Sequence, residues 1–211
     1  MAALNFSVNL AAPYFSVFMP KDLGFNYFTH TLLVTAVSFA QILSIDSWGG
    51  HVERVDNLKI MRLTSFIIAS LALRWIINHK PLFLIFIQLL SGFAWLGFNL
   101  CATNFIYDAV TPAKRTRCIA YFNAITGVTL CLGALLGGCL INIFPKIFGF
   151  RILSLFLVFS ILRFLLVILI SRKIKEVRKI DKIKSKDLFY SVLGLRTIFK
   201  DDQIEKYFKG F

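Results

Sequence analysis

A few polar side chains stand within long apolar stretches of the chain, and their chemistry is hydrogen bonding rather than catalysis. Two lie on the first such stretch, and the others recur at three- and four-residue steps along the fourth: Asn5, Asn9, Gln88, Ser91, Trp95, Asn99 and Thr103. This spacing places each set on one face of a helix. These groups could contact a polar solute, or they could form hydrogen bonds between helices.

The reactive residue types form no catalytic or metal-binding pattern. The three histidines are far apart along the chain, and no Ser-His-Asp set, carboxylate pair or phosphate-binding loop is recognisable. The four cysteines include no CxxC pair and have no histidine at ligand spacing. We therefore expect no enzyme, no metal site and no cofactor.

The composition is that of a membrane protein. Of 211 residues, 57% are hydrophobic and only 17% are charged, whereas soluble domains carry about 25% charged residues. The net charge is +13, and 12 of the 24 Lys and Arg residues follow Ser171. This distribution favours attraction to anionic lipid headgroups, and no motif supports nucleic-acid binding.

Six apolar segments are predicted to cross a bilayer as helices. Their approximate bounds are Ala2–Met19, Tyr27–Trp48, Leu63–Asn78, Leu82–Tyr107, Ile119–Phe144 and Phe148–Ile170. Pro13 is expected to kink the first of them. We predict an all-α membrane protein, with a six-helix transmembrane domain over residues 1–171 and a basic cytoplasmic tail, partly an amphipathic helix, over 172–211.

Lys and Arg are distributed asymmetrically between the connecting segments. They gather in Trp48–Arg62, in Val110–Arg117 and in the tail, whereas the opposite loops hold one lysine each. Because positive charge marks the cytoplasmic side, we predict an integral protein of a bacterial cytoplasmic membrane with both termini in the cytoplasm. Gly49 and Gly50 are expected to allow a tight reversal in the first of these loops.

The fifth and sixth segments differ in how they are expected to pack. Small residues on the fifth predict close helix packing, and the glycines among them are Gly127, Gly133, Gly137 and Gly138. The sixth is apolar nearly all round and is expected to face lipid. Its Arg163 is expected to snorkel to the cytoplasmic face, and Arg74 of the third segment to reach the outer interface. The second segment carries a small polar stripe at Ser38, Gln41 and Ser44.

Three stretches resemble motifs of the major facilitator superfamily. Gly49, Glu53 and Arg54, followed by the basic Lys59 and Arg62, are similar to the signature loop Gly-x-x-x-Asp-Arg-x-Gly, although Asp56 replaces the second glycine. Asp108, Pro112 and Arg115 resemble the acidic-Pro-Arg pattern of the fourth-to-fifth loop, and residues 133–138 resemble the Gly-Pro-x-x-Gly-Gly stretch of the fifth helix. The likeness extends over about Asn5 to Ile170.

The resemblance implies one six-helix half, the C-terminal one, of a secondary transporter that works by alternating access. It implies a cavity lined by the first and fourth helices, with the third and sixth on the lipid side. Arg54 would pair with Asp108 in a gate, and Glu53 would face the start of the fifth helix. The partner would be a second half or another copy of the chain, and the substrate an unidentified small solute. The alternative is a six-span membrane anchor or adaptor that does not transport.

The predicted topology can be tested by labelling single cysteines in intact cells, on a background that lacks the four native cysteines. Cysteines at positions 56 and 114 should resist a membrane-impermeant thiol reagent added outside, because both positions lie in segments predicted to be cytoplasmic. Labelling at either position without cell lysis would contradict the predicted orientation.

Overall fold

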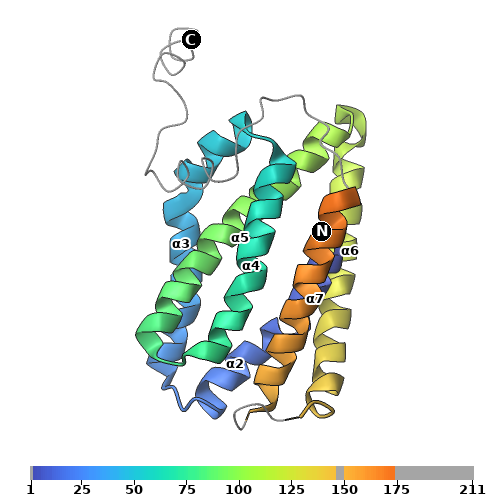
Figure 1. Ribbon diagram of the computed structural model, residues 1–211. Helices are drawn as coiled ribbons and strands as arrows, with labels where there is room; N and C mark the ends of the chain where they lie inside the picture. The colour runs from blue at the N-terminus through green and yellow to red at the C-terminus, as the bar shows by residue number, and fades with distance from the viewer. Residues whose placement is uncertain (1, 146–149, 174–211) are drawn as a thin grey trace.

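The computed structural model describes residues 2–145 and 150–173, which form an all-α bundle (Figure 1). The predicted tail after Lys173 therefore lies outside the described residues. The helices are α1 (Ala2–Asn9), α2 (Ala12–Lys21), α3 (Tyr27–Arg54), α4 (Asn57–Ile77), α5 (Pro81–Ala109), α6 (Pro112–Ile141) and α7 (Arg151–Lys173).

Among the described residues, five helices, α3 to α7, are long and apolar enough to cross a membrane. Three of them have 28, 29 and 30 residues, which at 1.5 Å per residue exceeds the roughly 30 Å hydrocarbon core. These helices continue into what we predicted to be loops, because interfacial polar residues do not end a helix. The second to sixth predicted segments therefore correspond to α3 to α7; α3 to α6 are longer than predicted, and α7 has the predicted length but begins three residues later.

The first predicted segment is not one kinked helix but two short ones, α1 and α2, of 8 and 10 residues. Pro13 stands at the beginning of α2. Proline has no N–H and its ring clashes with the carbonyl four residues earlier, so the helix ends before it and begins again. The break falls at Leu10 and Ala11, both buried.

The expected glycine reversal between the second and third segments is wrong. Gly49 and Gly50 are helical, and α3 continues through them to Arg54. The turn is made by Val55 and Asp56, and the Asp56 carboxylate accepts a hydrogen bond of 3.1 Å from the Lys59 backbone N–H as the N-cap of α4. The residue that departs from the family's second glycine thus begins the next helix.

The second predicted basic loop is also mostly helical. Only Val110 and Thr111 separate α5 from α6, and Pro112 occupies the first turn of α6. A proline is favourable there because its missing N–H would have no partner inside the helix. Lys114, Arg115 and Arg117 therefore project from the first turns of α6 rather than from a flexible loop.

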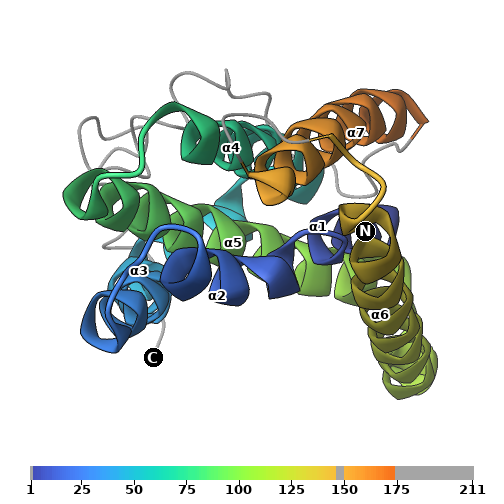
Figure 2. The same cartoon turned by 90° about the horizontal axis from the view of Figure 1, so that it is seen from below.

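The helices are arranged around α5, as the view along the bundle shows (Figure 2). α4 and α7 lie on one side, and α1, α2, α3 and α6 lie on the other. α3 and α5 approach closely because α5 has glycines at the contact: a Cβ on Gly92 would overlap the Val37 carbonyl oxygen, and one on Gly97 would lie 2.6 Å from the Trp48 ring. The Trp48 indole N–H also donates to the Phe93 carbonyl at 2.9 Å.

The sixth predicted segment, α7, has two different faces although it is apolar nearly all round. One face is exposed and carries Ile161, Leu165 and Leu169. The other is buried at a helical spacing by Ile152, Leu153, Phe156, Phe159, Ser160, Arg163 and Val167. The helix lies on the outer side with α4, but half of its surface belongs to the core (Figure 2).

Small residues of α6 meet the break between α1 and α2. A Cβ on Gly133 would lie 3.0 Å from the Phe6 carbonyl oxygen, one on Gly137 would overlap the Leu10 carbonyl oxygen, and one on Gly138 would lie 2.7 Å from the Tyr14 hydroxyl. That hydroxyl donates to the Ala134 carbonyl at 2.5 Å. By contrast, no atom lies within 4 Å of a Cβ built on Gly127.

Replacing Gly137 by alanine should lower the stability of the protein, because the added methyl group cannot fit beside the Leu10 carbonyl. Overpacking of this kind costs about 1–3 kcal/mol. The matched variant Gly127→Ala should be neutral or stabilising, since alanine is the better helix former and the site is open. Thermal unfolding in mild detergent compares the two, and equal transition temperatures would contradict the α1–α6 contact.

Candidate functional site

The break in the first segment leaves backbone carbonyls without the partners that a continuous helix would supply. The Ala11 N–H bonds to the Val8 carbonyl at 3.1 Å rather than to the carbonyl of Ser7. Pro13 has no N–H to donate to Asn9. Buried carbonyls without donors are unfavourable, so another group must approach this point of the chain.

Arg163 of α7 supplies donors to two of the carbonyls at this break, those of Ser7 and Val8. Its Nε and Nη2 donate to the Ser7 carbonyl at 3.4 and 3.3 Å, and Nη2 also donates to the Val8 carbonyl at 3.2 Å. The residue is only 5% exposed and lies about 18 Å along α7 from its first residue. The expectation that Arg163 snorkels to the cytoplasmic face is therefore wrong: the side chain turns inward to the broken helix.

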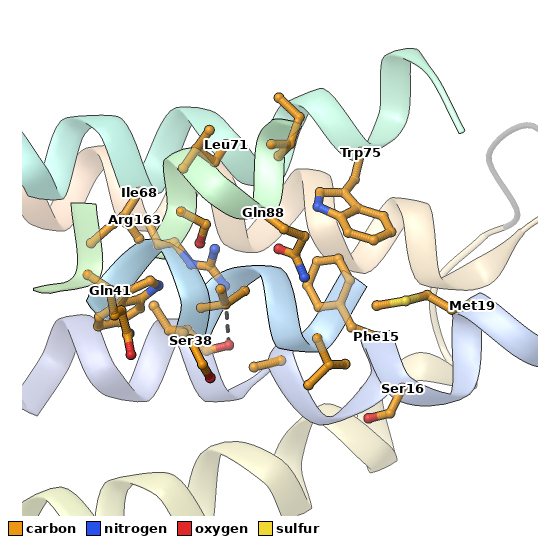
Figure 3. A pocket seen from close by; sticks show the side chains of 17 residues that line it. Phe15, Ser16, Met19, Ser38, Gln41, Ile68, Leu71, Trp75, Gln88 and Arg163 are labelled. Atoms are coloured by element: carbon orange, nitrogen blue, oxygen red, sulfur yellow. Dashed lines mark hydrogen bonds between the residues drawn. The ribbon is translucent and has the colours of Figure 1, made fainter. Parts of the chain in front are cut away.

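Arg163 also lines a cavity of about 460 Å³ between α2, α3, α4, α5 and α7 (Figure 3), and Val8 of α1 contributes to the lining. Its polar lining comes from Ser16, Ser38, Gln41, Gln88, Ser91 and Arg163, and its aromatic lining from Phe15, Trp75 and Trp95. Phe15 packs edge-on against Trp75 with ring centroids 4.7 Å apart. In Figure 3 the Gln88 side chain lies between this aromatic pair and Arg163. The cavity thus has a cationic and amide-bearing part and an aromatic part.

Of the seven polar residues noted on the first and fourth segments, three line the cavity, namely Gln88, Ser91 and Trp95. Asn9 instead donates its Nδ2 to the Asn5 carbonyl at 2.8 Å and packs against Gly133. Thr103 donates to the Asn99 carbonyl at 3.0 Å, and both side chains are exposed.

The polar stripe of α5 faces the cavity only over part of its length, because residues spaced by four shift gradually around the helix. Each four-residue step advances about 40° around the helix, so the three steps from Ser91 to Thr103 amount to about 120°. Ser91 and Trp95 line the cavity, whereas Asn99 and Thr103 turn to the outside.

Residues that sequence reasoning did not assign to the site include Arg163, Ser38 and Gln41. Ser38 and Gln41 belong to the polar stripe noted on the second segment, which was a usable signal. For Arg163 the usable signal was its position relative to the other polar residues of the sixth segment. Ser154 and Ser160 precede it on the same segment, and all three side chains are buried. The Nη1 of Arg74 donates to the Ser70 hydroxyl at 2.9 Å, one turn earlier on α4, and the expectation that Arg74 reaches the outer interface stays a prediction.

A second polar group lies at the end of the bundle where α4 begins and α5 ends. Asn57, fully buried, donates its Nδ2 to the Asp108 carboxylate at 3.0 Å. The Arg115 guanidinium lies 5.5 Å from the centre of the Tyr107 ring, a cation–π distance. The side chains of Glu53 and Arg54 lie outside the described residues, so the predicted Arg54–Asp108 pair stays a prediction.

Within residues 2–145 and 150–173, no group of three or more His, Cys, Asp or Glu side chains could hold a metal ion. Five long apolar helices, four of which line a partly polar cavity, define an integral membrane protein with room for a small solute.

Comparison with known families agrees with this class. A family model described as Major Facilitator Superfamily matches residues 1–206. The chain therefore belongs to the major facilitator superfamily, a family of membrane transporters, and its helices are consistent with half of that fold. No curated protein and no solved structure matched the chain.

Replacing Asp108 by leucine should destabilise the junction of α4 and α5, because the buried Asn57 amide would lose its acceptor. A buried donor left without a partner costs about 1–3 kcal/mol. Asp108→Asn keeps a carbonyl oxygen and should cost less. Thermal unfolding of both variants in detergent tests this, and a leucine variant as stable as the asparagine variant would show that the hydrogen bond contributes little.

Proposed function

We propose that the chain transports a small solute across the membrane by alternating access, as one half of a secondary transporter. The observation that carries the proposal is the cavity in which Gln41, Gln88 and Arg163 accompany aromatic side chains inside a helical bundle. Polar residues in a bilayer are costly and are usually found where a substrate or ion passes. The family supports the same activity.

A partner follows from the exposed surface. Asn99 of α5 is exposed at a point of the bundle where lipid would otherwise surround it, and an unsatisfied amide in hydrocarbon costs several kcal/mol. We propose that this side of the bundle meets a second six-helix half or another copy of the chain. The proposed location is a bacterial cytoplasmic membrane, with both termini in the cytoplasm, because of the Lys and Arg distribution.

Alternating access can be tested without knowing the solute. A single cysteine in place of Ser91, which lines the cavity, should react with a membrane-impermeant thiol reagent from either side of the membrane. The control is a cysteine in place of Lys80, which is exposed at one end of the bundle and should react from one side only. Labelling of position 91 from one side alone, under all conditions, would favour the anchor or adaptor instead.

The partner can be tested by crosslinking. A cysteine in place of Asn99, which is exposed on α5, should form a crosslink to a second half or a second copy in native membranes. A cysteine in place of Leu157, which is half-buried on α7, should not. A stable monomer that resists crosslinking at position 99 would contradict the half-transporter proposal.

A further inference from the structure

We propose that the cavity binds a small organic carboxylate, held by the guanidinium of Arg163. The proposal names a substrate class for the transport function proposed above and rests on it. Binding is a property of the cavity itself, however, so it can be measured apart from transport. The argument depends on the charge of Arg163, on its free donors and on what surrounds it.

The charge of Arg163 has no carboxylate partner among the described residues. Neither residues 57–107 nor residues 109–171 contain an Asp or Glu. Of the acidic side chains that the structure describes, Asp22 follows the end of α2, Asp46 is exposed on α3, and Asp56 and Asp108 lie at the α3–α4 and α5–α6 junctions. A buried cation without an anion is strongly unfavourable, so a bound anion would stabilise this site.

The two carbonyls that Arg163 contacts do not replace an anion. They are neutral dipoles, and their hydrogen bonds are long, at 3.2 to 3.4 Å. They use Nε and Nη2, whereas Nη1 makes no hydrogen bond to any described residue. A guanidinium has five N–H donors in a planar fork that fits a carboxylate. Because Arg163 lines the cavity, a carboxylate entering it can reach the remaining donors.

The other residues that line the cavity indicate the size and polarity of the part of the ligand beyond its carboxylate. Phe15, Trp75 and Trp95 offer aromatic surface, and Gln88 offers an amide between the aromatic pair and the cation (Figure 3). A cavity of about 460 Å³ is at the small end of ligand pockets, which span roughly 300–1,000 Å³. The chemistry fits a monocarboxylate with a compact apolar or aromatic body better than a sugar or a polyvalent anion.

The test uses the full chain in a neutral detergent, with benzoate as the probe and benzamide as its uncharged counterpart. Binding is followed by tryptophan fluorescence, since Trp75 and Trp95 line the cavity. Benzoate should give a saturable change and benzamide should not. Arg163→Gln should weaken benzoate binding by about tenfold or more. Arg74→Gln should leave it unchanged, because Arg74 is bonded to Ser70 on its own helix and does not line the cavity.

A second pair of variants keeps the test decisive if Arg163→Gln does not fold. Gln88→Glu places a carboxylate in the cavity that competes with the probe, and should reduce benzoate binding by about tenfold or more. Gln88→Leu fills similar space without charge and should reduce binding much less. Equal effects of glutamate and leucine, or equal binding of benzoate and benzamide, would overturn the proposal.

The anion could also be the phosphate of a lipid headgroup, and the same assay separates the two sources. Phosphatidylglycerol added to the micelles should not displace benzoate, and displacement would overturn the assignment to a solute.

The transport proposal and the carboxylate proposal can fail separately, and the experiments distinguish the two failures. Benzoate binding that depends on Arg163, without labelling of position 91 from both sides, would retain the site and reject transport. Labelling from both sides without benzoate binding would retain transport and reject the carboxylate.

Discussion

The structure depends on one requirement, that the interrupted backbone of the first segment be supplied with hydrogen-bond donors inside the bundle. In a bilayer no water is present to do this, so the partners must come from other helices. Arg163 of α7 donates to the Ser7 and Val8 carbonyls. On the other side, Gly137 lets the backbone of α6 approach the Leu10 carbonyl closely. α6 and α7 thus both contact the chain at or just before the break that precedes Pro13.

This arrangement also explains why the cavity exists where it does. In a continuous first helix the backbone carbonyls would accept hydrogen bonds from N–H groups of the same helix. Arg163 would then lack the acceptors toward which it turns. The break separates α1, which meets α6 and α7, from α2, which continues toward α3. The cavity lies beside this separation, and the residues that line it come from segments distant in sequence.

The apolar segments and the class of the fold could be predicted from the sequence, because the bilayer imposes helix length and apolarity on each span. The ends of the helices could not be predicted, because a proline such as Pro112 is compatible both with a loop and with the first turn of a helix. Gln88 and Trp95 were found from periodicity, but Asn99 was not excluded, since the rotation of the stripe matters only when the neighbouring helices are known. Arg163 was misread because its proximity to the basic end suggested snorkelling, whereas its acceptors lie more than 150 residues away in the chain.

That separation has a consequence for synthesis of the protein. Arg163 is 156 residues from Ser7, and at roughly 5–20 residues per second the ribosome needs about 8–30 s to make the intervening chain. For that time the nascent first segment has no α7 to complete it. Until then the Ser7 and Val8 carbonyls lack the donors of Arg163 and need other hydrogen-bond partners. Among the helices that the structure describes, the last thus completes the hydrogen bonding of the first.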